Sequence, residues 1–235
     1  MQSHPRDKNL LFNEEKHVYT TIDGKELPSV TTYLHRFFPD FPKEKIAEIV
    51  RHKPGKYNGM KAEDIIIKWD REGKEARELG TLMHAQIENY LLRRELPETQ
   101  SKEFNQFLEF WSKFTTNNPF VSVYRLEWRV YTDNIAGSID CVCITAKGNI
   151  IIIDWKRSKE IKKTNRFSKC LKPLNHLDDC NYNHYSLQLN AYRYILEKEY
   201  NAKVKGMYIV SFHPNQETYK AFPVPRMDEE INKIL

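Results

Sequence analysis

Two carboxylates and a lysine stand close together in a strand-like part of the sequence. The motif GSID ends at Asp140, and thirteen residues separate it from the motif DWK at 154–156. Because side chains alternate along a strand, Asp154 and Lys156 are expected on one face and Trp155 on the other. Two carboxylates repel each other unless a cation neutralises them, and their hard oxygens suit Mg²⁺ or Mn²⁺. Such a cation assists phosphodiester hydrolysis, and a neighbouring lysine stabilises the developing charge.

The tripeptide D-x-K is common at the ends of surface strands, so its neighbours in the sequence matter. His84 lies on a helical stretch with Glu88 one turn later on the same face, and His84 is a candidate third metal ligand. Gln188 and Tyr192 are spaced i, i+4 on a later helical stretch. Each pair taken alone is more often a solvated helix surface.

Glu127 is a further acidic candidate, on the strand that precedes Asp140. It is expected either to support the site or to face the substrate. A cross-strand salt bridge to Arg125 or Arg129 is an equally good interpretation of the same residue.

A basic segment follows the lysine directly. Eight Lys or Arg residues lie between Lys156 and Lys172, with Phe167 among them. Cations track phosphates and an aromatic ring stacks on an unpaired base, so the segment is a candidate nucleic-acid contact. Its candidate contact residues are Lys162, Lys163, Arg166 and Phe167. The alternative is a solvated basic loop.

The elements that must position these residues can be read from periodicity. Helical patterns cover 69–94, 101–115, 185–200 and the end of the chain. Strand patterns at 121–132, 135–145 and 149–157 are joined by short turns and predict an antiparallel meander, with further strands at 205–214 and 219–225. The sequence therefore predicts an α/β domain with a mixed central sheet flanked by helices.

The first part of the chain, 1–74, predicts two short strands around an Asp23-Gly24 turn and two short helices. One helix is expected to begin near Ser29 or Thr31, and the other after Pro42. We expect this segment to pack on a core formed by 75–235, with one compact domain overall.

Four motifs in this order resemble a known family. GTxxH ends at His84, GSID at Asp140, IDWK at Lys156 and QLxxY at Tyr192. Together they resemble the RecB-like branch of the PD-(D/E)xK nucleases, which includes the Cas4-like nucleases, and they imply a restriction-endonuclease-like core. The segment LPSVT at 27–31 resembles a motif of the mitochondrial genome maintenance exonuclease group. The name-giving Pro-Asp is Ile-Asp here, as is usual in this branch.

The resemblance implies roles for individual residues. His84, Asp140 and Asp154 would bind the metal, with the carbonyl of Trp155 as a further ligand, and Lys156 would be the catalytic lysine. Gln188 would position the scissile phosphate or water as part of the catalytic set. Tyr192 would pack beside the site or contact the strand.

The resemblance also implies a substrate. A single-stranded DNA or a flap with a free end is expected, cleaved by an exonuclease that takes part in DNA repair or replication. No P-loop motif occurs, so a helicase or a replication or recombination partner would act in trans. The alternatives are an RNA or DNA endonuclease using the same metal site, and a catalytically dead nucleic-acid-binding module.

Composition limits the partners, cofactors and compartments that can be expected. Lys and Arg exceed Asp and Glu by 37 to 32, which is compatible with a polyanionic partner. No apolar run approaches a membrane span and the N-terminus has no secretory pattern, so no membrane association is expected. The four cysteines, at 141, 143, 170 and 180, lack zinc or disulfide spacing and lack the distribution of the iron–sulfur relatives. We therefore expect no iron–sulfur cluster and an intracellular, reducing compartment.

Overall fold

A five-stranded mixed sheet forms the centre of the protein. The computed structural model describes residues 4–16 and 18–235. Its strands, in spatial order, are β4 (Val121–Tyr131), β5 (Ala136–Thr145), β6 (Ile150–Arg157), β7 (Val204–Phe212) and β8 (Lys220–Pro223). The first three form the predicted antiparallel meander, β7 runs parallel to β6, and β8 is antiparallel to β7. The predicted α/β class with a mixed sheet is confirmed.

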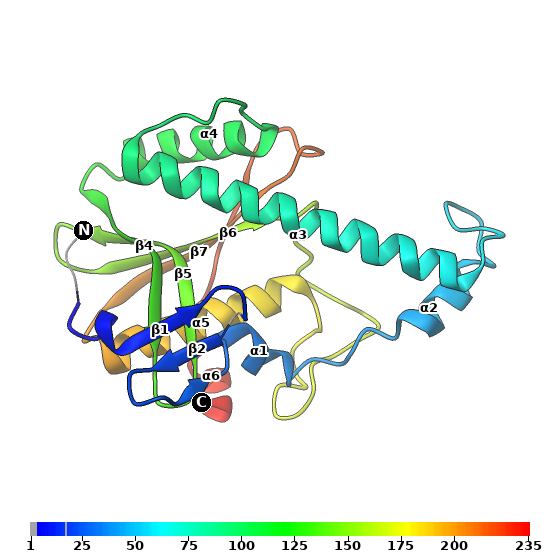
Figure 1. The fold of residues 1–235 in the computed structure, drawn as a ribbon, viewed down its shortest axis with the longest axis horizontal. Helices are drawn as coiled ribbons and strands as arrows, with labels where there is room; N and C mark the ends of the chain where they lie inside the picture. The colour runs from blue at the N-terminus through cyan, green and yellow to red at the C-terminus, as the bar shows by residue number, and fades with distance from the viewer. Residues whose placement is uncertain (1–3, 17) are drawn as a thin grey trace.

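Helices cover both faces of this sheet (Figure 1). One face packs against α3 (Ala62–Arg93) and α4 (Lys102–Asn117), and Trp155 is buried there among Phe107, Phe110 and Phe212. The other face packs against α5 (Asn181–Glu199), with α1 (Val30–His35) and α6 (Asp228–Ile234) beside it. Trp155 and its two neighbours in sequence therefore point to opposite faces, as alternation predicts.

The long helix α3 has two different halves. Met83, Ile87 and Leu91 are buried against the sheet, as the four-residue periodicity predicts. Leu79, one turn before Met83, remains 38% exposed, and the N-terminal half of the helix extends beyond the sheet (Figure 1). That half packs beside α2 (Lys43–Val50). The helix begins at Ala62, seven residues before the predicted start at 69, because this half buries little apolar surface and carries little periodic signal.

The N-terminal segment forms a second, smaller sheet. Its strands are β1 (Leu10–Asn13), β2 (Val18–Thr21) and β3 (Glu26–Leu27), of which only the last two were predicted. The Oγ of Ser29 caps α1 by accepting from the amide of Thr32 at 3.0 Å. The amide of Ala136 donates to the carbonyl of Pro28 at 3.1 Å. The LPSVT segment is thereby tied to the start of β5, one residue before the GSID motif.

None of the helices in the described residues is both long and apolar enough to cross a membrane.

Candidate active site

The hairpin of β4 and β5 bends where it carries two acidic residues. Glu127 lies directly opposite Asp140, since the preceding residue Leu126 pairs with Cys141. The backbone of Glu127 has a φ of 42°, a left-handed conformation that is uncommon outside glycine and clusters at functional sites. Ile139 packs toward α5, whereas Cys141 packs toward α3 and α4, although residues two apart share a face in a regular strand. The bend at this point turns Asp140 toward the neighbouring strand β6.

Strand β6 presents the second carboxylate and the lysine beside Asp140. The amide of Trp155 donates to Asp140 Oδ2 at 2.7 Å, which joins the two strands at the site. Asp154 is only 2% exposed, and Lys156 Nζ lies 2.8 Å from its Oδ2. The two groups form a buried ion pair, and an ionised carboxylate has further lone pairs that a metal cation can take.

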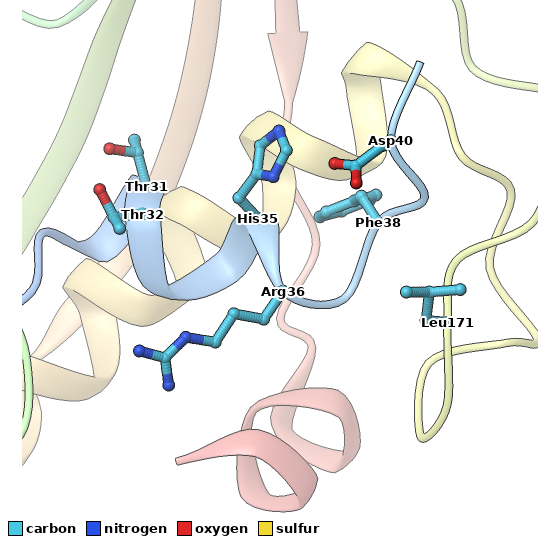
Figure 2. A pocket seen from close by; sticks show the side chains of 7 residues that line it. All are labelled: Thr31, Thr32, His35, Arg36, Phe38, Asp40 and Leu171. Carbon is cyan, nitrogen blue, oxygen red and sulfur yellow. The ribbon is translucent and has the colours of Figure 1, made fainter. Parts of the chain in front are cut away.

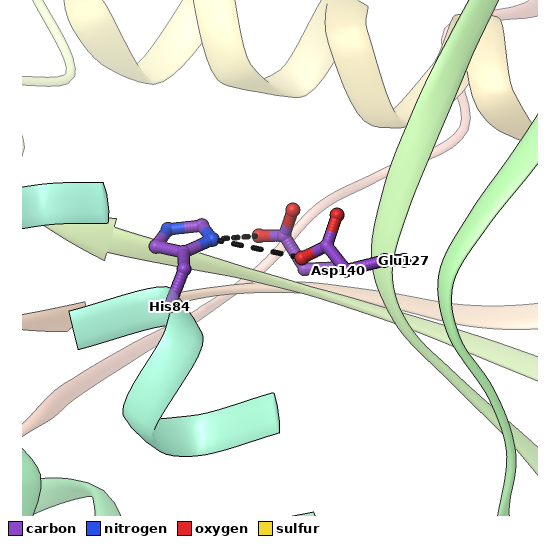
Figure 3. Close-up of side chains that lie close together, drawn as sticks. All are labelled: His84, Glu127 and Asp140. Atoms are coloured by element: carbon purple, nitrogen blue, oxygen red, sulfur yellow. Dashed lines mark ion pairs between the residues drawn. The ribbon is translucent and has the colours of Figure 1, made fainter. Parts of the chain in front are cut away.

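His84 reaches the same point from α3. Its Nε2 lies 3.0 Å from the carbonyl oxygen of Trp155, and its Nδ1 lies 3.8 Å from Asp140 Oδ2 and 3.9 Å from Glu127 Oε1. Figure 3 shows the imidazole pointing at both carboxylates. One ligand atom from each of these three side chains lies within 4.8 Å of the others, so His84, Glu127 and Asp140 form a candidate metal site. The hard oxygens and the imidazole fit a divalent cation.

The charges in the site shift one another's proton affinity. Burial is the largest influence on His84 and lowers its pKa, but the carboxylates of Asp140 and Glu127 outweigh it and raise that pKa to about 9. Burial raises the pKa of Asp140 to about 7; the cations of His84 and Lys156 oppose the shift, and Asp154 and Glu127 add to it. Crowded negative charge of this kind is relieved when a cation binds.

The ammonium group of Lys156 is held by neighbouring polar and aromatic groups. Burial lowers the pKa of Lys156, but Asp154 and Asp140 outweigh it and raise that pKa, so the side chain is a cation. Its Nζ donates to Gln188 Oε1 at 3.2 Å and lies 4.6 Å from the centre of the Tyr185 ring. Tyr185 is a residue that the sequence reasoning missed, although its place one turn before Gln188 on a helix could have indicated it.

Gln188 connects the lysine to Tyr192 and, through it, to the GSID motif. The Nε2 of Gln188 donates to the Tyr192 hydroxyl at 3.3 Å. The ring of Tyr192 lies against Gly137, where an added Cβ would come within 2.7 Å of ring atom Cε1. The glycine of GSID is therefore needed for a close approach of this ring. Two of the sequence motifs thus meet in one packed contact.

The structure gives Glu127 neighbours other than the arginines considered from sequence. Among the described residues, Arg125 pairs with Asp7 at 2.8 Å and Arg129 pairs with Glu14 at 3.9 Å, and neither forms an ion pair with Glu127. The salt-bridge alternative for Glu127 is therefore not what the structure contains.

Glu88 lies near the same acidic group, on the outer side of the site. Burial, followed by the nearby Glu127 carboxylate, raises the pKa of Glu88. Glu127 itself accepts a hydrogen bond from Ser138 Oγ at 2.9 Å, which orients it toward His84. Both glutamates line a hollow beside the site with a volume of about 400 Å³.

The basic-loop residues lie apart from the carboxylates, on the connection between β6 and α5 at 158–180. Lys163 stacks over the ring of Tyr182 at 5.1 Å, and Phe167 is 98% exposed. Lys162, Arg166 and Phe167 line their own hollow of about 440 Å³. Within the described part of the chain, none of the four predicted contact residues forms an ion pair or hydrogen bond with the carboxylates of the site.

Comparison with known proteins identifies the superfamily. The family model described as the PD-(D/E)XK nuclease superfamily matches residues 96–234, more than half of the chain. Asp140, Asp154, Lys156 and Gln188 lie within the matched segment, and His84 lies before it. No curated protein matches the chain.

The solved structures that match this chain are distant from it. A phage-related exonuclease from Haemophilus somnus 129PT is 12% identical, with 88% of each chain covered and a TM-score of 0.35. SSO0001 is 16% identical, with a TM-score of 0.28 and coverage of 54% of this chain and 52% of its own. This chain thus matches about half the length of SSO0001.

Proposed function

The chain belongs to the PD-(D/E)XK nuclease superfamily, and we propose that it is a Mg²⁺- or Mn²⁺-dependent deoxyribonuclease. Its substrate is a single-stranded DNA or a flap, which it degrades from a free end as an exonuclease. The superfamily implies a nucleic-acid substrate and a divalent metal. The preference for DNA, for a single strand and for an end follows the motif resemblance to the RecB-like branch and the mitochondrial exonuclease group.

The observation that carries this proposal is the convergence of charged groups around a buried carboxylate oxygen. Asp154 is 2% exposed, its Oδ2 lies 2.8 Å from Lys156 Nζ, and the Asp140 carboxylate is close enough to interact with both. His84, Glu127 and Asp140 converge beside this pair, with one ligand atom from each within 4.8 Å of the others. Buried carboxylates gathered in this way repel one another unless a cation neutralises them.

We assign metal binding to His84, Asp140 and Asp154, with the carbonyl of Trp155 as a further ligand. Glu127, opposite Asp140, either binds the metal as well or orients His84 through its carboxylate. A divalent cation held there supplies Lewis-acid polarisation of the phosphate and lowers the pKa of a bound water. All of these groups except the histidine lie on strands of the central sheet, which suits the rigid placement that catalysis needs.

Lys156 stabilises charge that develops on the phosphate or on the attacking water. Its ammonium group is oriented by Gln188 and by the ring of Tyr185. Gln188 positions the phosphate or the water, and the Tyr192 hydroxyl holds Gln188 in place by accepting a hydrogen bond from its Nε2. Lys162, Lys163, Arg166 and Phe167 contact the strand farther from the cleaved bond.

Two alternatives remain within the same fold. An RNA or DNA endonuclease would use the same metal ligands. A catalytically dead nucleic-acid-binding module is disfavoured, because such proteins lose the lysine or an acid, whereas Asp140, Asp154 and Lys156 are all present. We further propose that residues 1–74 and the core form one domain, and that a helicase or a replication or recombination partner acts with it in trans.

One experiment tests the function directly. End-labelled single-stranded and duplex DNA, internally labelled circular DNA and matched RNA are incubated with Mg²⁺, Mn²⁺ or EDTA. We expect cleavage of linear single strands with metal and none in EDTA or on circles. Cleavage of circular DNA would indicate an endonuclease, cleavage of RNA alone a ribonuclease, and full activity in EDTA would contradict the metal mechanism.

A further inference from the structure

A groove runs between α1 and α5 beside the active site. Its wide part, about 660 Å³, lies over α1 and reaches Leu171 in the basic loop (Figure 2). Its narrow part, about 150 Å³, reaches Tyr185 and Gln188 on α5. Both parts are lined by Thr31, His35 and Phe38, so they are continuous. We call the combined hollow the α1–α5 groove; its lining includes Thr31, His35, Phe38, Leu171, Tyr185 and Gln188.

Two residues of the narrow part, Tyr185 and Gln188, contact the catalytic lysine. Gln188 accepts a hydrogen bond from Lys156 Nζ at 3.2 Å, and Tyr185 lies under the same ammonium group at 4.6 Å. Any chain that places a phosphate against Lys156 therefore brings the adjacent unit of that chain to the mouth of the groove.

The groove has an aromatic floor and a polar rim. Phe38 is 4% exposed, and its ring is stacked on His184 at a centroid distance of 3.4 Å. Thr31 and His35 are exposed above this floor, and Figure 2 shows their side chains on the same side of α1. Hydroxyl and imidazole groups supply hydrogen bonds, and the rings of exposed His35 and half-buried Tyr185 supply flat surfaces, while Phe38 closes the groove beneath them. A nucleobase with its sugar needs both kinds of contact.

Charge along the groove is asymmetric. Arg36 lines the wide part, and Lys156 lies next to Tyr185 and Gln188 of the narrow part, so a cation is close to each end of the groove. Asp40 also lines the wide part, where its carboxylate repels phosphate but accepts hydrogen bonds from the amino groups of a base. The arrangement suits a base directed into the groove with its phosphates outside it.

From these contacts we propose that the α1–α5 groove binds one unpaired nucleotide adjacent to the cleaved phosphate. The base enters the groove over Phe38, beside His35 and Thr31. A base that is paired and stacked in a duplex cannot enter, so the groove itself selects unpaired strand at this position. This inference rests on the proposed nuclease function and deepens it, because it assigns the single-strand preference to named residues.

The proposal is tested by removing a base from the substrate and by filling the groove in the protein. Single-stranded oligonucleotides carry one abasic residue at successive positions on either side of the cleaved bond, and kcat/KM is measured with Mn²⁺. For the wild-type protein we expect one adjacent position at which loss of the base lowers kcat/KM about tenfold, the value of one stacked base. The effect is expected mainly in KM.

Two variants locate that position in the groove. His35→Ala removes one wall, so we expect a lower kcat/KM on the intact strand and a smaller further loss from the abasic residue. Thr31→Trp fills the part shared by the two hollows. This variant is expected to cleave the abasic strand better than the intact strand, which reverses the wild-type preference. The matched control His52→Ala, an exposed histidine on the turn after α2, leaves both values unchanged.

The outcomes separate this inference from the function on which it rests. Metal-dependent cleavage with no position-specific abasic effect, or with additive losses in His35→Ala and no reversal in Thr31→Trp, overturns the groove assignment alone. Absence of metal-dependent cleavage of any nucleic acid by the wild-type protein overturns both. Thermal melting with and without Mn²⁺ shows whether each variant is folded and retains its metal response.

Discussion

The carboxylate site and the basic loop are neighbours along the chain but are built in different ways. At the site, Asp140, Asp154 and Lys156 are held by strand register and by contacts of 2.7 to 3.2 Å. In the loop, Phe167 is 98% exposed, Lys163 lies over the ring of Tyr182, and Lys162 forms an exposed ion pair with Glu160. Groups held rigidly in a buried site act through geometry, whereas exposed cations act through summed charge. Single substitutions should therefore have large effects at the site and small effects in the loop.

The largest effect is expected from the site itself. Lys156→Ala and Asp140→Ala should each lower the cleavage rate by about 10²- to 10⁴-fold, because each removes charge stabilisation or a metal ligand at the reacting phosphate. Single-turnover cleavage of end-labelled DNA measures the loss. Lys156→Ala should keep its response to metal, because the ligands remain, whereas metal-induced stabilisation of Asp140→Ala should shrink.

Trp155→Phe is the control for these two variants. Its side chain lies on the opposite face against Phe107 and Phe110, so the change should lower stability more than the rate of chemistry. Wild-type cleavage by Lys156→Ala, together with loss of cleavage in a stable Trp155→Phe protein, would overturn the assignment of faces along β6.

A smaller effect is expected at Gly137, where the GSID motif packs against the ring of Tyr192. Gly137→Ala places a Cβ 2.7 Å from the buried Tyr192 ring, so we expect a loss of about 1–3 kcal/mol in the free energy of unfolding. Gly80→Ala is the matched control, because nothing lies within 4 Å of the added Cβ and alanine favours a helix by up to about 1 kcal/mol. Urea denaturation of both variants measures the difference. Equal stability changes of the same sign would contradict the packing of Tyr192 on the glycine.

The comparison also shows why the sequence predicted one part of the site and not another. The facing of Asp154, Trp155 and Lys156 follows from alternation, which is a local property. The position of Glu127 opposite Asp140 depends on strand register and on a left-handed backbone, and neither is visible in the residue types. Sequence reasoning therefore left the role of Glu127 open.

The groove and the helix boundaries were missed for related reasons. The α1–α5 groove brings Thr31 and His35 beside Tyr185, which is about 150 positions away in the sequence, and no periodic pattern reports such a contact. Strand β1 was missed because its residues, LLFN, show no alternation of apolar and polar side chains. The core of the fold was predictable because its helices and strands bury long, regular apolar faces.

A modest effect is expected from the basic loop. Charge reversal of Lys162, Lys163 and Arg166 together should weaken DNA binding about tenfold and flatten its dependence on salt, because fewer phosphate counterions are released. Fluorescence anisotropy at several salt concentrations measures both quantities. The thermal stability should not change, since these side chains are largely exposed.

The control for this variant is a triple reversal elsewhere. Lys147, Lys205 and Lys233 are exposed and lie outside the loop, and reversing them changes the net charge by the same amount. If both triple variants lose affinity equally, the effect is due to net charge. An unchanged affinity and salt slope in the loop variant would make the loop solvated surface.

The smallest expected effect is a pH dependence of metal binding. It should depend on the carboxylate site and not on the basic loop. The folded-state pKa values of Asp140 and His84, about 7 and about 9, lie above their ordinary values of 3.8 and 6.5. The metal-free protein therefore binds more protons than the unfolded chain, so these two groups lower its stability as pH rises from about 4 to about 9. Metal ligation requires both groups to lose their protons, so Mg²⁺ affinity rises over the upper part of this range. The rise in melting temperature caused by Mg²⁺ should consequently be a few degrees larger at pH 8.5 than at pH 6.

Two variants show whether this pH dependence belongs to the site. Asp140→Asn removes one of the two protons that the metal must displace, so both the Mg²⁺-induced shift and its change with pH should decrease. Without metal, the same variant should be more stable than the wild-type protein above pH 7, because it lacks a carboxylate that is costly to ionise. The triple loop variant should keep the wild-type Mg²⁺ response at every pH, since its charges lie outside the ligand set. A Mg²⁺-induced shift that is the same at pH 6 and pH 8.5 would mean that neither Asp140 nor His84 gives up a proton on ligation, and the metal would then have to bind through other oxygens.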